Sequence, residues 1–351
     1  MLFDNKTLPE HGGVFSADVL DFSANLNPLG MPENVRAALE RSVGDWERYP
    51  DPDCAELTRR LSERLGVPPE KIVCGSGAAD LIYRIIGAVR PKRALIAVPC
   101  FSEYRKALEE SGAEVCEYFL SEDNGFAAGD DLPKAVTERL SGGDMLILAS
   151  PNNPTGRVIP RELLREICAE CERRGVVFLC DECFLEFVKN LSSVREFLAP
   201  CVISLSAFTK TYALAGLRLG YAVFGEEELA KTVKRRGQFW SVSAPAQTAG
   251  IAALDKRNKD YLERSRRLIF EQRKFLTAEL SRLDIKVFPS DANFLLLKTE
   301  LPLYDILFEQ GIIIRRCSNF DTLNENFYRI AIRTENENKR LISALERGIN
   351  G

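Results

Sequence analysis

The sequence predicts an α/β fold, with a large domain whose mostly parallel sheet lies between helices and a smaller α/β domain after it. Three observations lead to this prediction. The 351 residues are enough for a large core and two lobes. From about residue 70 to 225, short apolar runs alternate with helical patterns, as in a parallel sheet covered on both faces. After a long helical stretch, from about 244 to 283, a second and shorter alternation begins.

The strands of the large domain are expected where runs of four to six apolar, β-rich residues occur. These runs are 71–74, 93–98, 145–148, 176–180, 202–205 and 219–224. Ligands of such sheets bind at the carboxyl ends of the strands. Gly75, Pro99, Asp181 and Ser206 directly follow four of these runs, and Ser150 lies two residues after a fifth. A binding site is therefore expected at this edge of the sheet.

The second alternation predicts the strands of the smaller domain. They are expected at 285–288, 293–297, 312–314 and 327–332. The domain boundaries that follow are an N-terminal arm at 1–44 that packs on the small domain, a large domain at 45–243, and a long helix with the small domain at 244–351.

The net charge of the chain limits the classes of partner that it is expected to bind. The net charge is −4, which gives no strong field to attract nucleic acid or an anionic membrane. No apolar run approaches the ~20 residues of a membrane span, and the N-terminus lacks a basic segment followed by an apolar one. We expect a cytoplasmic protein that binds neither nucleic acid nor membranes.

Ten cysteines raise the question of disulfides or a metal. Without an export signal, disulfides are not expected. Cys168 and Cys171, and Cys180 and Cys183, have the spacing of zinc ligands. The first pair falls on a predicted helix at 161–174, and the second brackets Asp181. We therefore expect no metal site.

Lys210 is the most informative residue of the chain. A lysine can hold pyridoxal phosphate as a Schiff base, and a carboxylate such as Asp181 keeps the cofactor ring nitrogen protonated. We expect Lys210 and Asp181 to be the catalytic residues. Asn153, in Pro-Asn-Asn-Pro-Thr-Gly, suits the ring hydroxylate, and Arg218, in Gly-Leu-Arg-Leu-Gly-Tyr, suits the phosphate.

In this order, the three motifs resemble those of fold-type I pyridoxal-phosphate enzymes. Within that group the chain resembles the branch that holds histidinol-phosphate aminotransferase and threonine-phosphate decarboxylase. The resemblance extends from His11-Gly12-Gly13 to Arg333-Thr334. It implies an aspartate-aminotransferase-like fold, pyridoxal 5'-phosphate as cofactor, and a homodimer with shared active sites.

The resemblance also implies how the cofactor is held. The glycine turn at 75–80 lies between a strand and a helix, where free amides favour a phosphate. A hydroxyl and the guanidinium of Arg218 bind the other side of the phosphate. Ala207 occupies a position where relatives often have a phosphate-binding serine, so Thr209 or Ser206 must supply that hydroxyl. Phe101 stacks on the ring, and Tyr49 reaches the phosphate of the neighbouring subunit. The expected phosphate and ring contacts are Gly77, Ala78, Ala79, Phe101, Asn153, Asp181, Ser206, Thr209, Lys210, Arg218 and Tyr49.

For the substrate, the resemblance implies a small phosphorylated amino acid. Arg329 matches the residue that pairs with the substrate carboxylate, and Arg333, four residues on in the expected strand, shares its face by alternation. Arg315 resembles the source of a second anion contact. The full set of expected substrate contacts is His11, Asn27, Asn153, Arg315, Arg329 and Arg333.

Two departures from the aminotransferase pattern bear on the reaction. Phe184 stands where many relatives have a tyrosine that donates to the ring hydroxylate. His11 resembles the N-terminal histidine of threonine-phosphate decarboxylases. We interpret the chain as a decarboxylase of threonine phosphate that gives aminopropanol phosphate for cobalamin. The alternatives are a histidinol-phosphate or related aminotransferase and a cofactor-binding regulator without turnover, which an intact Lys210 disfavours.

Overall fold

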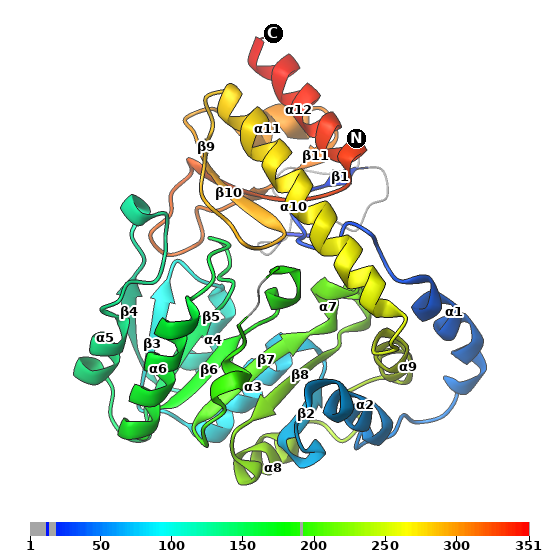
Figure 1. The fold of residues 1–351 in the computed structure, drawn as a ribbon, viewed down its shortest axis with the longest axis vertical. Helices are drawn as coiled ribbons and strands as arrows, with labels where there is room; N and C mark the ends of the chain where they lie inside the picture. Colours follow the sequence, from blue (N-terminus) through cyan, green and yellow to red (C-terminus); the bar gives the residue numbers. More distant parts are fainter. Residues whose placement is uncertain (1–11, 14–18, 190–191, 351) are drawn as a thin grey trace.

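The structure is a computed structural model that describes residues 12–13, 19–189 and 192–350. Its main sheet has seven strands in the order β2-β8-β7-β6-β5-β3-β4 (Figure 1). β8 runs antiparallel to both of its neighbours, β2 and β7, and the other pairs of adjacent strands are parallel. The strands are β2 (Ile72–Gly75), β3 (Arg93–Val98), β4 (Glu114–Phe119), β5 (Met145–Ala149), β6 (Val177–Asp181), β7 (Val202–Ala207) and β8 (Gly220–Phe224). The prediction of a mostly parallel sheet is confirmed.

The sequence did not predict β4. This strand lies at the edge of the sheet, and the charged residues Glu114 and Glu117 interrupt the apolar ones along Glu114–Phe119. A search for continuous apolar runs finds strands that are buried on both faces, and β4 is not one of them.

Helices cover both faces of the main sheet. Successive residues of a strand pack into two separate hydrophobic cores, one on each face of the sheet. Leu146 packs with α5 and α6, and Ile147 packs with α3 and α4. This is why the strands read as continuous apolar runs. The helices of this part are α1 (Glu33–Ser42), α2 (Ala55–Leu65), α3 (Gly77–Val89), α4 (Ser102–Glu110), α5 (Leu132–Arg139), α6 (Arg161–Arg174), α7 (Phe208–Thr211), α8 (Glu227–Arg235) and α9 (Ala244–Ala253).

The expected helical stretch at 244–283 is two helices, α9 and α10 (Asn258–Arg282). The break falls where Asp255 turns its carboxylate back to accept the Arg257 backbone N–H at 2.9 Å. Such local bonds compete with the helical ladder. In Figure 1, α10 runs as a long yellow helix from the main sheet to the far end of the second domain.

The second domain holds an antiparallel sheet in the order β12-β13-β10-β9 and a parallel pair, β1 with β11. Because β1 comes from the N-terminal part of the chain, the two ends of the described chain meet here. Its elements are β1 (Leu20–Asp21), β9 (Lys286–Val287), β10 (Phe294–Lys298), α11 (Leu303–Phe308), β11 (Ile312–Ile313), β12 (Arg315–Arg316), β13 (Phe327–Ala331) and α12 (Glu335–Asn350).

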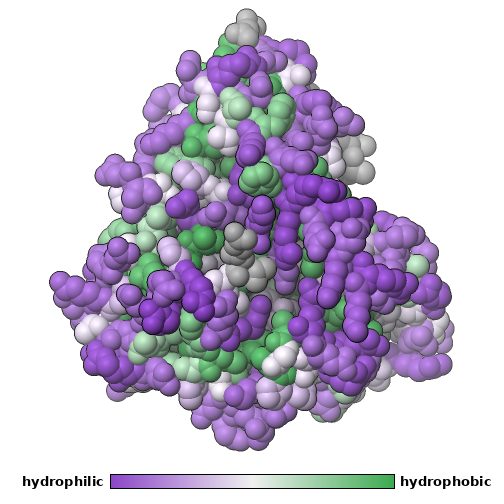
Figure 2. Space-filling model, viewed as in Figure 1, coloured by the Kyte–Doolittle hydropathy of each residue, from purple (hydrophilic) through white to green (hydrophobic). Residues whose placement is uncertain are grey.

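Short 3-10 helices connect several of these elements. They are η1 (Val43–Asp45), η2 (Pro69–Lys71), η3 (Glu122–Asn124), η4 (Leu185–Phe187), η5 (Val194–Phe197) and η6 (Ala215–Leu217). In the part of the chain that the structure describes, no helix combines the length and apolar character needed to cross a bilayer. The face in Figure 2 is mainly hydrophilic, with apolar residues in small patches.

Candidate active site

A cavity of about 340 Å³ opens at the carboxyl ends of β5, β6 and β7, as the strand pattern predicted. The start of α3, the start of α4 and residues of the second domain complete its walls. It is lined by Gly12, Asn25, Ala78, Ala79, Phe101, Glu103, Tyr104, Ala149, Pro151, Asn153, Asp181, Cys183, Phe184, Ala207, Thr209, Lys210, Arg218 and Arg329. Most of the side chains predicted to hold the cofactor are therefore brought together in one place.

Lys210 lies on α7, the single turn that directly follows β7. Its backbone carbonyl accepts the Asn27 N–H at 3.0 Å, which ties the turn to the N-terminal segment. Desolvation, followed by the positive charge of Arg329, lowers the pKa of the Lys210 amine from 10.5 to about 8. About a tenth of this amine is therefore neutral, and nucleophilic, at pH 7, far more than for a lysine with a pKa of 10.5.

Asp181 ends β6 and is buried, with both carboxylate oxygens in hydrogen bonds. Oδ2 accepts the Tyr104 hydroxyl at 2.6 Å, and Oδ1 accepts the Cys183 backbone N–H at 2.9 Å. Burial, and then the charge of Asp181, raises the pKa of Tyr104 well above its ordinary value. Tyr104 therefore stays protonated and donates to a carboxylate that the hydrogen bonds hold in place.

The start of α3 forms an anion cradle with Arg218. Gly77 has a φ of +86°, and a Cβ built on it would lie 2.6 Å from Arg218 Nη2, so only glycine leaves room for this arrangement. Ala78 and Ala79 line the cavity with the first amides of the helix, which lack intrahelical partners. A phosphate is the group that such amides and an arginine bind.

Phe101 and Asn153 flank the cavity between Lys210 and the second domain. Phe101 packs edge-on against Tyr104, with ring centroids 5.6 Å apart, and leaves a face on the cavity. Asn153 Oδ1 accepts a hydrogen bond from Arg329 Nη1. Its Nδ2 amide is thus left as the donor that a ring hydroxylate requires.

Arg329 is the cation at the second-domain wall, only 4% exposed. Besides Asn153, it donates from Nη2 to the Ser23 carbonyl at 2.8 Å. Its buried Nε has no hydrogen-bond partner within the described residues. Desolvation lowers the pKa of Arg329 to about 10, so it remains cationic at neutral pH.

Four of the expected side-chain contacts, namely Asn27, Ser206, Arg315 and Arg333, do not line this cavity. Asn27 bonds the Thr211 carbonyl and Ser265 Oγ, both at 2.8 Å, and so braces the lysine turn. Ser206 lies on the opposite face of β7 from Ala207, against Tyr221, so Thr209 is the hydroxyl that lines the cavity.

Arg333 does not share the face of Arg329, because β13 ends at Ala331. Its guanidinium pairs with Glu337 at 2.6 Å and donates to the Asp21 carbonyl at 2.9 Å. These bonds join α12 to the N-terminal segment and keep Arg333 out of the cavity lining. Arg315 is buried, and its Nη2 donates to Asn319 Oδ1 at 2.7 Å.

Two further predicted residues stand apart from the cavity of this chain. Tyr49 is 79% exposed and stacks on Trp240, with ring centroids 4.1 Å apart. His11 lies outside the described residues, whereas the adjoining Gly12 lines the cavity.

Sequence reasoning missed Tyr104 and Asn25. Tyr104 falls three residues after Phe101, on the first turn of α4, but nothing local signals its bond to Asp181. Asn25 and Asn27 occur in one short stretch, and it is Asn25 that lines the cavity, with a buried Oδ1 that has no partner among described residues. Phe184 also lines it and packs on Phe294, with ring centroids 5.0 Å apart.

A buried amine beside a carboxylate, an aromatic ring and an anion cradle define the site of a fold-type I pyridoxal-phosphate enzyme. The sequence profile described as "Aminotransferase class I and II" matches residues 17–345, and the chain belongs to that family. Pyridoxal 5'-phosphate is its cofactor. Lys210, Asp181, Asn153, Phe101, Thr209, Arg218 and the start of α3 fit the groups of this molecule.

The chain is 36% identical over 345 residues to the threonine-phosphate decarboxylase of Salmonella typhimurium, covering 97% of this chain and 93% of that protein. Two crystal structures share its fold. The histidinol-phosphate aminotransferase of Clostridium acetobutylicum has a TM-score of 0.86 and 30% identity, covering 95% and 100% of the two chains. The L-threonine-O-3-phosphate decarboxylase of Porphyromonas gingivalis has a TM-score of 0.84 and 26% identity, covering 95% and 100%.

Proposed function

We propose that the protein decarboxylates a small phosphorylated amino acid, L-threonine O-3-phosphate, to aminopropanol phosphate for cobalamin biosynthesis. The observation that best supports an anionic substrate is the register of β12 and β13, in which Arg315 stands directly opposite Arg329. Two buried like charges at this position destabilise a sheet unless an anion lies between or beside them. The similarity to the Salmonella decarboxylase supports the choice of reaction.

The residues of the chain divide the work. Pyridoxal 5'-phosphate, when bound, supplies the electron sink that accepts the electron pair left by CO2. Asp181, held by Tyr104 and the Cys183 amide, places a negative charge where the ring nitrogen would be. Lys210, with a pKa of about 8, returns a proton to the substrate α-carbon after CO2 has left.

Arg329 has the role of binding the substrate carboxylate. Its guanidinium has five N–H donors, and the two bonds to Asn153 and Ser23 leave donors for a substrate. Arg315 would meet the substrate phosphate together with His11. A phosphate carries about −1.5 to −2 charges at neutral pH, which matches the positive charge of this wall.

We propose further that the active protein is a cytoplasmic homodimer. Tyr49 is exposed in the single chain and lies far enough outward not to line its own cavity. A second copy would bring Tyr49 to the phosphate cradle of its neighbour. This arrangement agrees with the large exposed area of the Tyr49 ring.

Transamination of histidinol phosphate or a related amine is the second candidate. Its supporting observation is the fold shared with the Clostridium histidinol-phosphate aminotransferase. The two reactions need the same lysine, carboxylate and phosphate cradle, and they differ in which bond to the α-carbon is broken. Phe184, which has no hydroxyl for the ring hydroxylate, disfavours the aminotransferase.

The deciding experiment supplies purified protein with threonine phosphate, serine phosphate or histidinol phosphate, each with and without 2-oxoglutarate. We expect CO2 from threonine phosphate without 2-oxoglutarate and no glutamate from histidinol phosphate. Lys210→Ala protein is the blank. Glutamate from histidinol phosphate without any CO2 from the phosphorylated hydroxy-amino acids would establish the aminotransferase instead. No product from any of them would contradict both reactions and favour a regulator.

A further inference from the structure

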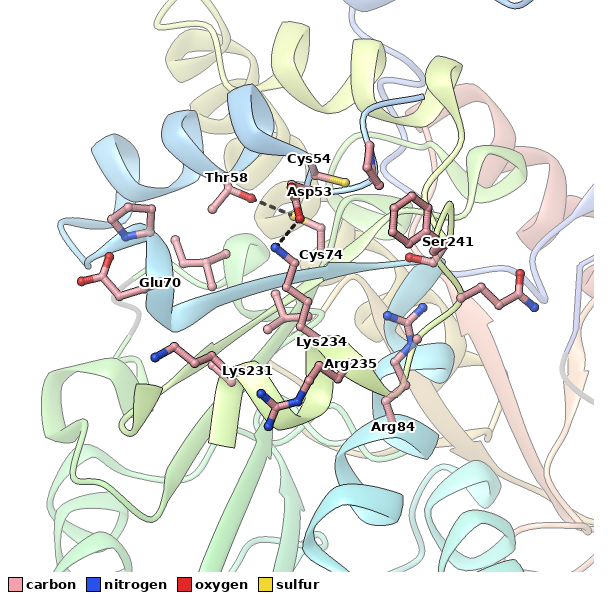
Figure 3. A pocket seen from close by; sticks show the side chains of 18 residues that line it. Asp53, Cys54, Thr58, Glu70, Cys74, Arg84, Lys231, Lys234, Arg235 and Ser241 are labelled. Carbon is pink, nitrogen blue, oxygen red and sulfur yellow. Dashed lines mark hydrogen bonds and ion pairs between the residues drawn. The ribbon is translucent and has the colours of Figure 1, made fainter. Parts of the chain in front are cut away.

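A second cavity, of about 610 Å³, lies away from the active site and contains two cysteines (Figure 3). Its walls come from the segment before α2, from α2 itself, from β2 and η2, and from α8 and the residues after it. Cys54 and Cys74 line it from different elements, the former at the start of α2 and the latter in β2. Neither residue takes part in the chemistry proposed above.

The two cysteines line the same cavity and both have Thr58 as a neighbour. Figure 3 shows Cys54, Cys74 and Thr58 on the same wall. The Thr58 hydroxyl is 3.8 Å from Cys74 Sγ, and the Thr58 backbone N–H donates to the Cys54 carbonyl at 2.8 Å. Lys234 stands over the pair, in an ion pair with Asp53 at 2.7 Å. Thr58 thus holds both cysteines in register.

The pKa values of the two thiols are shifted in opposite directions. A hydrogen bond from Cys54, and then one from Thr58, lowers the pKa of Cys74 below its ordinary value. The same contact, together with burial, raises the pKa of Cys54. A thiol of lowered pKa beside one of raised pKa is the arrangement of a dithiol that reacts by exchange, because the thiolate is the nucleophile.

The conformation at Cys54 also fits a reactive position. Its φ of +50° is in the left-handed region, which residues other than glycine seldom adopt. By contrast, Cys168 and Cys171 are buried within α6, and desolvation raises the pKa of both.

We propose that Cys54 and Cys74 are a redox-active dithiol that closes to a disulfide by exchange with a small-molecule disulfide such as oxidised glutathione. The Cys74 thiolate attacks one sulfur of oxidised glutathione and releases one glutathione thiolate. Cys54 then gives up its proton and attacks Cys74 Sγ, which releases the second. The protein loses two electrons and two protons, and the glutathione disulfide gains both as two thiols.

The bond would join two parts of the cofactor site. Cys74 directly precedes Gly75 and the turn that leads into the phosphate cradle at Gly77. Cys54 ends the segment that begins at Tyr49. A disulfide between them would fix this segment to β2, whichever reaction the enzyme catalyses.

The test treats purified holoenzyme with oxidised glutathione, unfolds it in guanidinium chloride at about pH 8 with excess iodoacetamide already present to block the remaining thiols, and maps the peptides by mass spectrometry. We expect the peptides of Cys54 and Cys74 to be joined and to separate on reduction. Cys168 and Cys171 are the internal control and should be alkylated. If Cys54 and Cys74 are alkylated as completely as this control pair, the proposal is wrong.

Two single variants test the order of attack. In Cys54→Ser protein, the second step is blocked, so glutathione should remain attached to Cys74. In Cys74→Ser protein, Cys54 should acquire glutathione at least tenfold more slowly, since it lacks the thiolate character. The visible absorbance of bound cofactor reports that each variant is folded. Equal modification of Cys54 in the absence of Cys74 would overturn the assignment of the nucleophile, and the wild-type peptide map needs neither variant.

Discussion

Tyr104 and Asp181 are 77 residues apart in the sequence, and in the structure the Tyr104 hydroxyl donates a 2.6 Å hydrogen bond to Asp181 Oδ2. Tyr104 lies in the first turn of α4, a helix that covers the main sheet. Asp181 is the last residue of β6, a strand of that sheet. Both are buried. The carboxylate that faces the cofactor is therefore positioned by a helix on the neighbouring layer, not by its own strand alone.

Tyr104→Phe should leave cofactor bound and slow catalysis. A hydrogen bond to a charged group contributes about 1.5–3 kcal/mol, which corresponds to a roughly 10- to 100-fold fall in kcat. Tyr118→Phe is the matched control, because Tyr118 makes the same kind of bond to Asp131, outside the cavity lining. Steady-state kinetics of the two variants make the measurement. Equal rates in wild type and Tyr104→Phe would remove the positioning role of this hydroxyl.

The rate at which apoprotein takes up pyridoxal 5'-phosphate should rise with pH around a midpoint of about 8. The neutral amine of Lys210 is the nucleophile, and its fraction increases as pH rises through its lowered pKa instead of near 10.5. Stopped-flow absorbance measures the rate. In Arg329→Gln protein the midpoint should shift upward, because the nearby positive charge that lowers this pKa is gone. An unchanged midpoint in that variant would assign the whole shift to desolvation.

Arg329→Gln should raise the KM for threonine phosphate strongly, since it removes a buried charged contact that is expected to cost about 2–5 kcal/mol. Arg329→Lys keeps the positive charge but loses the bidentate geometry of the guanidinium. Its KM should therefore lie between those of Arg329→Gln and wild type. Arg316→Gln is the control. Arg316 is exposed and pairs with Asp305 at 2.9 Å, so its loss should change KM little. Comparable KM values for Arg329→Gln and Arg316→Gln would exclude a substrate contact at Arg329.

A shared site predicts complementation between two defective chains. Lys210→Ala removes the amine, and Tyr49→Ala removes the contact proposed for the neighbouring subunit. In a mixed dimer, one site then has both lesions and the other has none. An equal mixture that is unfolded and refolded together should recover up to roughly a quarter of wild-type activity at limiting cofactor. A mixture that gives only the average of its two components would place Tyr49 outside the partner's site.

The sequence alone determined the elements and the residues that local patterns mark. The apolar runs predicted β3 (Arg93–Val98) and α6 (Arg161–Arg174) at their observed bounds, since burial on both faces or on one stripe leaves a period in the sequence. Asp181 was also marked by position, because it follows a predicted strand and neighbouring parallel strands bring such positions to one edge. Lys210 was predicted from its sequence motif and the resemblance to fold-type I enzymes.

The tertiary structure decided which side chains face the cavity. Asn25 and Asn27 are equivalent in the sequence, yet contacts with Thr211 and Ser265, far along the chain, use the amide of Asn27. Ser206 and Thr209 differ because strand alternation turns one to the far side of the sheet. Arg333 forms an ion pair with Glu337, and the Tyr104 hydroxyl donates a hydrogen bond to Asp181. In each case the deciding contact joins separate elements, and its energy depends on packing that exists only in the folded chain.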